Sequence, residues 1–168
     1  IDPVRTPTAA HADWHLQIRP GTDGALALGM MHVITREQLQ DQAFIDEHTL
    51  GYEQLCERVT EYPPERVADI TGLDAADIEQ LAREYATTRP SLLRSVVGME
   101  RYSNGHSNVR AMSCLPPLIA AWRERGVGIF SFTVTIFMAA LVYVAILPPP
   151  EPASRARKVH LCQLGNEF

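Results

Sequence analysis

The chain has 168 residues, of which 46% are hydrophobic and 21% are charged, close to the values of an average soluble globular protein. This length suits one ordinary domain or one lobe of a larger enzyme, and the composition excludes collagen, wholesale disorder and a membrane protein built of many helices. Fifteen basic and 20 acidic residues give a net charge of −5. We therefore expect no nucleic acid as a partner, because no basic field is present to neutralise phosphates.

Strand and turn patterns occupy the beginning of the chain. Residues 1–3 suit the end of a strand, because an Asp-Pro pair ends ladder pairing. Residues 6–10 suit a short helical turn with threonine as its cap and proline early in the turn. Residues 15–19 alternate polar and apolar side chains, which is the period of a half-buried strand, and Pro20-Gly21 ends it.

Helical patterns fill the middle of the chain. Apolar spacing and helix-start residues predict helices, in chain order, from residue 22 or 23 to 34, over 41–48, over 52–62, from 64 onward and over 74–87. In the first of these helices, Leu26, Met30, Val33 and Ile34 are spaced to form one apolar face. The last is the clearest, with Asp74 as its cap and a predicted buried stripe of Ile78, Leu81, Ala82 and Tyr85.

A strand and a further helix follow. Residues 91–98 predict a strand, residues 102–105 a turn, and residues 108–125 a helix that Pro116-Pro117 must kink or divide. The order of strands and helices along the chain predicts α/β organisation.

The segment 1–34 carries the residue types that a nucleotide site needs. Backbone N–H groups at a helix N-terminus and arginine side chains attract phosphate. A carboxylate at a strand exit, where Asp2 stands, can accept hydrogen bonds from ribose hydroxyls, and a second carboxylate can accept from a guanine edge. Gly21 lets the backbone approach a ligand closely. On spacing alone, two loops with ordinary turn and cap residues remain the alternative.

Several sequence runs together carry a family resemblance. They are residues 1–9, 16–26 (with Arg19-Pro20-Gly21-Thr22-Asp23), 32–34, 49–52, 62–68, 70–72, 76–86, 98–105, 109–111 and 163–165. On these runs the chain resembles the molybdopterin oxidoreductases of the dimethyl-sulfoxide-reductase and formate-dehydrogenase type. The resemblance is strong over residues 1–125 and weak over 138–168, and the Asp-Pro and Arg-Pro-Gly-Thr-Asp pair is its most specific part.

The resemblance implies a fold and a set of cofactor contacts. The fold is α/β, an incomplete and helix-rich Rossmann-like lobe of three layers, which holds one half of a molybdenum-bearing bis-molybdopterin guanine dinucleotide. Carried over residue by residue, the first nucleotide loop falls on Asp2, Pro3, Arg5 and Thr6, the second on Gly21, Thr22 and Asp23, and a third contact region on Val97, Gly98 and Arg101. Asp23 is the residue expected to face the guanine.

Two positions depart from the family pattern. Val4 stands where the family often has arginine, so phosphate contact rests more on Arg5. Glu100 stands where glutamine is usual, and its carboxylate is unfavourable near a phosphate unless Arg101 neutralises it.

Several parts of the family have no counterpart here. They are the N-terminal iron–sulfur cysteines, the Ser, Cys or selenocysteine ligand to molybdenum, and the C-terminal pterin-binding domain. We therefore expect no catalytic residue and no metal ligand in this chain, which would contribute cofactor contacts without catalysing alone. The expected partners are the remaining domains of a parent oxidoreductase, which carries a 4Fe–4S cluster, and a small-molecule redox substrate. The alternatives are a non-catalytic membrane-tethered module and an inactive truncated product.

The cysteines and the first residues bear on the compartment. Cys56, Cys114 and Cys162 are odd in number and form no Cys-x-x-Cys pair, which argues against disulfides and favours a reducing, cytoplasmic location. The chain opens at Ile1 without methionine or signal-peptide features, which predicts a segment cut from a longer chain.

Residues 127–147 contain no charged side chain over 21 positions. This length suffices to cross a bilayer, and Arg123 and Arg125 flank one end as an anchor would. The family comparison instead implies a loop-and-helix region at this place. The predicted division is therefore a cofactor-binding lobe at 1–125, an apolar segment of uncertain structure at 126–147, and a Pro-rich linker and tail at 148–168, with a membrane span as the less favoured alternative.

Overall fold

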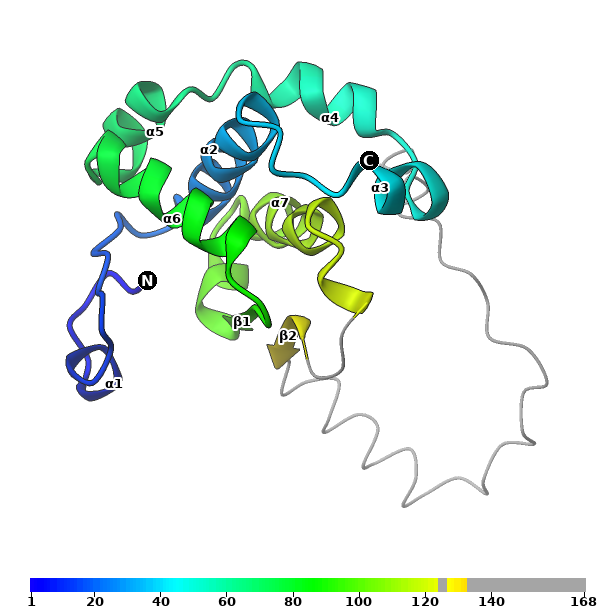
Figure 1. The fold of residues 1–168 in the computed structure, drawn as a ribbon. Coiled ribbons are helices and arrows are strands. Elements are labelled where there is room, and N and C mark those ends of the chain that lie inside the picture. Colours follow the sequence, from blue (N-terminus) through cyan, green and yellow to red (C-terminus); the bar gives the residue numbers. More distant parts are fainter. Residues whose placement is uncertain (124–126, 133–168) are drawn as a thin grey trace, which may run out of the picture.

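The computed structural model describes residues 1–123 and 127–132. Its elements, in chain order, are α1 (Pro7–Ala10), α2 (Asp23–Arg36), α3 (Gln42–His48), α4 (Tyr52–Val59), α5 (Pro64–Thr71), α6 (Ala75–Thr87), β1 (Leu92–Val96), the 3₁₀ helix η1 (Val97–Arg101), α7 (Gly105–Leu118), the 3₁₀ helix η2 (Ala121–Arg123) and β2 (Gly128–Phe132) (Figure 1). The described part is thus a helix-rich α/β structure.

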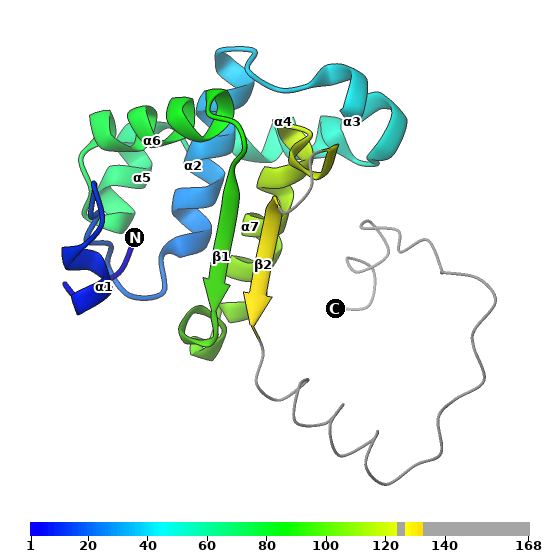
Figure 2. The ribbon, with the colours of Figure 1, turned by 60° about the horizontal axis from the view of Figure 1, so that its bottom comes forward.

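The sheet consists of two parallel strands among the described residues, with α7 as the main part of the crossover between them. Leu92 of β1 pairs with Gly128 of β2, and the register continues to Val96 and Phe132. Helices α2 and α7 lie behind the strands and run opposite to them (Figure 2). The N-termini of both helices and the carboxyl ends of both strands therefore lie at the same edge of the molecule.

Helix α2 is the centre of the core. Four of its side chains were predicted to form one apolar face, and all four are buried: Leu26, Met30, Val33 and Ile34. Met31 is buried as well, since α5, α6 and α7 pack around the helix. Gly29 permits the contact with α5, because a Cβ there would lie 2.9 Å from Cγ2 of Val67.

The helical predictions are confirmed with small shifts of their ends. Helix α3 begins after Asp41, whose carboxylate accepts the N–H of Phe44 at 2.9 Å. The helix predicted over 52–62 ends at Val59. In helix α6 the predicted stripe is buried at Ile78, Ala82 and Tyr85, while Leu81 is half-buried. The side chain of Asp74 makes no capping hydrogen bond. The strand predicted over 91–98 is β1.

Two predicted strands are absent, at residues 1–3 and at residues 15–19. The alternation at 15–19 is correct as burial, because Leu16 and Ile18 are buried and their neighbours Gln17 and Arg19 are exposed. No ladder forms, since the backbone bonds of this segment to distant residues go to two separate places, Asp2 near the N-terminus and Thr71 at the end of α5. The alternation of polar and apolar residues therefore predicts correctly which side chains are buried, but it does not predict correctly that the segment pairs as a strand.

The helix predicted over 108–125 is also corrected. It begins earlier, at Gly105, and ends at Leu118, followed by the short η2. Pro116 and Pro117 do not divide it, because they fall in its last turn, where the helix ends one residue later.

The uncharged run contributes a strand that the sequence did not predict. Residues Gly128–Phe132 form β2 beside β1. The rest of the run, 133–147, and the tail, 148–168, lie outside the described residues, so the division of the chain at 125 and 147 stays a prediction. Within the described part, no helix has the length and apolar character needed to cross a membrane.

Four charged side chains join the C-terminal end of α2 to α6. The Arg83 guanidinium donates to both carboxylate oxygens of Glu37, at 2.9 and 2.8 Å, and to Glu79 at 2.8 Å. Arg36 donates to the same two carboxylates at 2.8 and 2.7 Å. The hydrogen bonds from Arg83 and Arg36 lower the pKa of Glu37 to about 2, and those from Arg36 and Arg83 lower the pKa of Glu79.

The lowered pKa values predict acid-sensitive stability. A carboxylate whose pKa is lower in the folded state stabilises the fold above its unfolded pKa, and this contribution is lost as the pH falls through the folded pKa. Urea unfolding at several pH values should therefore show a free energy of unfolding that falls between about pH 4.5 and pH 2. Arg83→Gln should reduce the slope of this free energy against pH over the same range. Arg58→Gln, which removes an exposed pair with Glu61 inside a single segment, is the control and should leave it unchanged. Equal slopes in wild type and Arg83→Gln would contradict the assignment.

Candidate functional site

The first predicted loop lies beside the segment that leads to the second. The N–H of Asp2 donates to the carbonyl of Leu16 at 3.2 Å, and the amide of Gln17 donates to the carbonyl of Pro3 at 2.9 Å. A ring nitrogen of His15 lies 2.9 Å from the Asp2 carbonyl oxygen. These contacts hold together two parts of the chain that the resemblance assigned to one site.

Inside the first loop, the side chains of Asp2 and Thr6 shape the backbone. One carboxylate oxygen of Asp2 accepts the N–H of Val4 at 2.9 Å, and the hydroxyl of Thr6 accepts the N–H of Ala9 at 3.2 Å, which caps α1. Arg5 is exposed, and its guanidinium makes no ion pair with any residue that the structure describes. A cation is therefore available to an anionic ligand beside this loop.

The second loop leads into the N-terminus of α2. Gly21 has φ +79°, a conformation that favours glycine. Thr22 occupies the N-cap position, but its hydroxyl donates to the carbonyl of Arg19 at 2.7 Å and does not cap the helix. Asp23 is the first residue of α2 and is half-buried, and this burial raises the pKa of its carboxyl.

Arg19 has a structural role in place of a phosphate contact. Its guanidinium donates to the carbonyls of Asp69 and Ile70 near the C-terminus of α5, where a cation is favourable. Gly72 ends α5 with φ +79°, and a Cβ there would lie 3.2 Å from Nε of Arg19. The arginine of the Arg-Pro-Gly-Thr-Asp run therefore ties the segment before the second loop to the end of α5.

The third predicted region, Val97–Arg101, is η1 and follows β1 directly. Gly98 and Arg101 are both exposed. The next residue, Tyr102, joins this region to the second loop, because a Cβ on Gly21 would lie 3.2 Å from Cγ of Tyr102. The second loop and the third region thus meet at the edge where β1 ends, the usual place for ligands in α/β sheets, and the first loop lies beside the segment that leads to the second.

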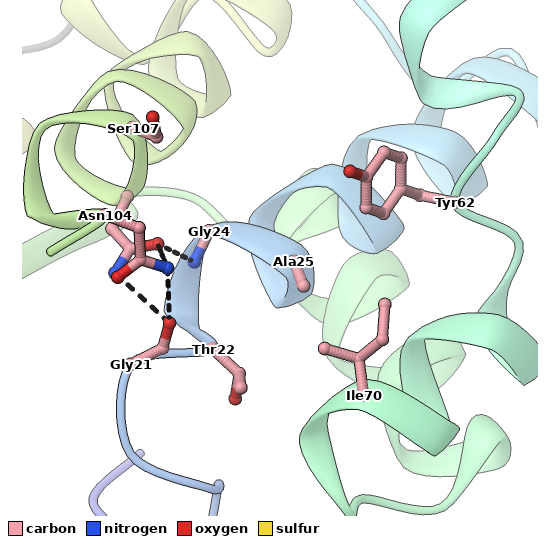
Figure 3. Close-up of a pocket in the computed structure, with 9 residues that line it drawn as sticks. Gly21, Thr22, Gly24, Ala25, Tyr62, Ile70, Asn104 and Ser107 are labelled. Carbon is pink, nitrogen blue, oxygen red and sulfur yellow. Dashed lines mark hydrogen bonds between the residues drawn. The ribbon is translucent and has the colours of Figure 1, made fainter. Parts of the chain in front are cut away.

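Two hollows open at this edge. One has a volume of about 260 Å³ and lies between the N-termini of α2 and α7, with Tyr62 and Ile70 on its other side (Figure 3). The other, of about 340 Å³, is bordered by Pro3, Arg19 and Gly72. Within the described ranges, no group of three or more His, Cys, Asp or Glu side chains is arranged to hold a metal ion.

Sequence reasoning missed two asparagines at this edge. The amide of Asn104 donates to the Gly21 carbonyl at 2.8 Å, and the side-chain oxygen of Asn108 accepts the N–H of Gly24 at 3.1 Å (Figure 3). Asn104 had been assigned only to a turn, and Asn108 only to a helix start. The available signal was their spacing of four, which places both side chains on one face at the start of α7.

Comparisons with known proteins agree on one family. The family model described as molybdopterin oxidoreductase matches residues 1–166. A probable oxidoreductase, YoaE, of Bacillus subtilis is 45% identical over 128 residues, which are 76% of this chain and 19% of that protein. The acetylene hydratase of Syntrophotalea acetylenica is 42% identical over 122 residues, 73% of this chain and 17% of that protein.

A solved structure confirms the likeness in three dimensions. The acetylene hydratase from Pelobacter acetylenicus superposes with a TM-score of 0.69 at 42% identity, over 71% of this chain and 16% of that one. The chain therefore spans less than a fifth of the length of the relatives it matches.

The closeness of α2 and α7 at Gly24 predicts the effect of a single methyl group. A Cβ at Gly24 would lie 2.6 Å from Oδ1 and 3.1 Å from Cα of Asn108, so Gly24→Ala must push the two helices apart. We expect a loss of about 1–3 kcal/mol in the free energy of unfolding, measured by urea titration. Gly98→Ala is the matched control, since nothing lies within 4 Å of its added Cβ, and should change stability by less than about 0.5 kcal/mol. Equal effects of the two variants would contradict this packing.

Proposed function

The chain belongs to the molybdopterin oxidoreductase family, and we propose that it binds one guanine nucleotide of a bis-molybdopterin guanine dinucleotide cofactor in a molybdenum enzyme. The observation that carries this proposal is that the second loop meets the third region at the edge where β1 ends, with the first loop beside the segment that leads to the second. Contacts between Asp2 and Leu16 and between Gly21 and Tyr102 support that meeting. An extended ligand at this edge would touch all three loops.

The residues of the edge fit such a ligand. Arg5 and Arg101 are exposed guanidiniums that suit the phosphates. The Asp2 carboxylate keeps one oxygen for ribose hydroxyls after its bond to Val4. Asp23 offers a half-buried carboxylate to the paired N–H donors of guanine, and its raised pKa reflects the cost of that burial.

The remaining predicted residues give the loops their shape. Pro3 and Thr6 shape the first loop, with Thr6 capping α1. Gly21 permits the positive φ that turns the chain into α2, and Thr22 ties that turn to Arg19. In the third region, open space beside Gly98, next to Val97, leaves room for a ligand.

We further propose that this segment is part of a Rossmann-like lobe of three layers. The parallel pair β1 and β2, with α2 and α7 on one face, supports this reading (Figure 2). Parallel sheets are as a rule covered on both faces, so the second helical layer would come from parts beyond the described residues.

The chemistry of the whole enzyme belongs to parts other than this segment. When bound, the molybdenum centre of the cofactor supplies electron transfer or Lewis-acid activation. This chain binds and orients the nucleotide end and provides no catalytic residue. The proposed partners are the other domains of the parent enzyme, which would carry a 4Fe–4S cluster, and a small-molecule redox substrate. The proposed location of the enzyme is the cytoplasm. One relative is named an oxidoreductase and another a hydratase, so family membership leaves the reaction open.

The assignment of Asp23 is tested by its removal from the enzyme that contains this chain. Asp23→Ala should lower the guanine nucleotide released from the purified protein, measured as GMP by chromatography after acid hydrolysis, because the guanine loses a charged acceptor worth about 1.5–3 kcal/mol. Asp13→Ala is the control, since Asp13 is exposed and lies outside the three loops. Unchanged molybdenum and GMP content in Asp23→Ala would contradict the assignment.

A further inference from the structure

We propose that Asn104 and Asn108 of α7 are positioning residues, which hold the turn from Gly21 to Gly24 so that Asp23 faces the guanine. This inference rests on the proposed function, because the ligand is the nucleotide proposed there. Neither asparagine is assigned a contact with the ligand. Both would act through the backbone on either side of Thr22 and Asp23.

The hydrogen bonds from Asn104 and Asn108 hold the turn from Gly21 to Gly24 at its two ends, and this set of bonds is here called the grip. The Nδ2 of Asn104 donates to the carbonyl oxygen of Gly21 at 2.8 Å, and Nδ2 of Asn108 donates to the same oxygen at 3.4 Å. At the other end, Oδ1 of Asn108 accepts the N–H of Gly24 at 3.1 Å. The backbone between these two points therefore cannot rotate without breaking one of the bonds.

The two amides also bond to each other, which fixes their orientations. Nδ2 of each asparagine lies 3.4 Å from Oδ1 of the other. The group of Gly24 that faces Asn108 is its N–H, a donor, and the group of Gly21 that faces both amides is its carbonyl, an acceptor. These partners determine which side-chain atom of each asparagine is oxygen and which is nitrogen. Asn108 is 2% exposed and every polar atom of its side chain has a partner, as a buried amide requires.

An ordinary helix cap does not explain this arrangement. Asn104 occupies the N-cap position of α7, where asparagine usually accepts an N–H from its own helix. Its side chain makes no such bond and is directed to Gly21 instead. The Asn104 side chain thus binds the backbone of a separate segment, 83 positions away in sequence, and does not cap its own helix.

The location of the pair links two of the proposed contact regions. Asn104 lies three residues after the end of η1 and Asn108 one helical turn further on, so the third region is connected through the start of α7 to the second loop. Tyr102 contacts Gly21 from the same side.

Hydrogen exchange tests the grip without reference to any ligand. In the full chain, Asn108→Ala should speed exchange of the Gly24 amide by about tenfold or more, because its acceptor is gone. Ser107→Ala, on the same turn and lining the same hollow, is the matched control and should have no effect. The Leu115 amide, in the same helix, reports whether the fold is intact.

Binding of GMP to the same variants, measured by calorimetry, tests the positioning role. Asn108→Ala and Asn104→Ala should weaken GMP binding by about tenfold, and Ser107→Ala by less than about twofold. Unchanged Gly24 exchange in Asn108→Ala with intact Leu115 protection would overturn the grip. Faster exchange with unchanged GMP affinity would overturn the positioning role.

Two further outcomes separate this inference from the proposed function. If the wild-type chain binds no GMP although the Gly24 amide is protected, the proposed function fails and the positioning role fails with it, while the grip itself stands. If Asn108→Ala also loses protection at Leu115, Asn104→Ala decides, since Asn104 is exposed and its loss leaves the core intact. Wild-type GMP affinity in that variant would overturn the inference.

Discussion

The close approach of α2 and α7 at Gly24 is the constraint on which the candidate site depends. The missing side chain lets the Asn108 amide reach the backbone of α2 and keeps the N-termini of both helices together. Because both helices run opposite to β1 and β2, the same edge collects the carboxyl ends of the strands (Figure 2). The second loop and the third region meet there as a result of packing, and the first loop lies beside the segment that leads to the second.

The two ends of α2 have different roles. At the N-terminus, backbone and amide hydrogen bonds hold a turn whose carboxylate, Asp23, carries a raised pKa because it is half-buried. At the C-terminus, Glu37 is bound by two arginines and its pKa is lowered to about 2. The ionic contacts thus stabilise the helix at the end remote from the site, while Asp23 bears the cost of burial at the site itself.

Local patterns were sufficient to predict most helices and β1, because their apolar periods and start residues match the observed burial, as at Asp41 and Ile78. They were not sufficient for residues 15–19, where alternating burial occurs without a neighbouring strand. They were also not sufficient for β2, whose uncharged run was assigned to an apolar segment of uncertain structure, with a membrane span as the less favoured alternative. The three loops were predicted from the resemblance, and the bonds from the Arg19 side chain to the end of α5 could not be read from either the resemblance or a local pattern. The asparagine grip depends on a contact across 84 positions, which no local pattern contains.

The central claim, that a guanine nucleotide binds where the three loops meet, is tested most directly by mapping amide chemical shifts of the full chain during titration with GMP. We predict the largest shifts together in residues 2–6, in Gly21 to Asp23 and in η1, with little change in α3 and α4. Largest shifts in α3 or α4, or shifts confined to one of the three loops, would contradict the claim.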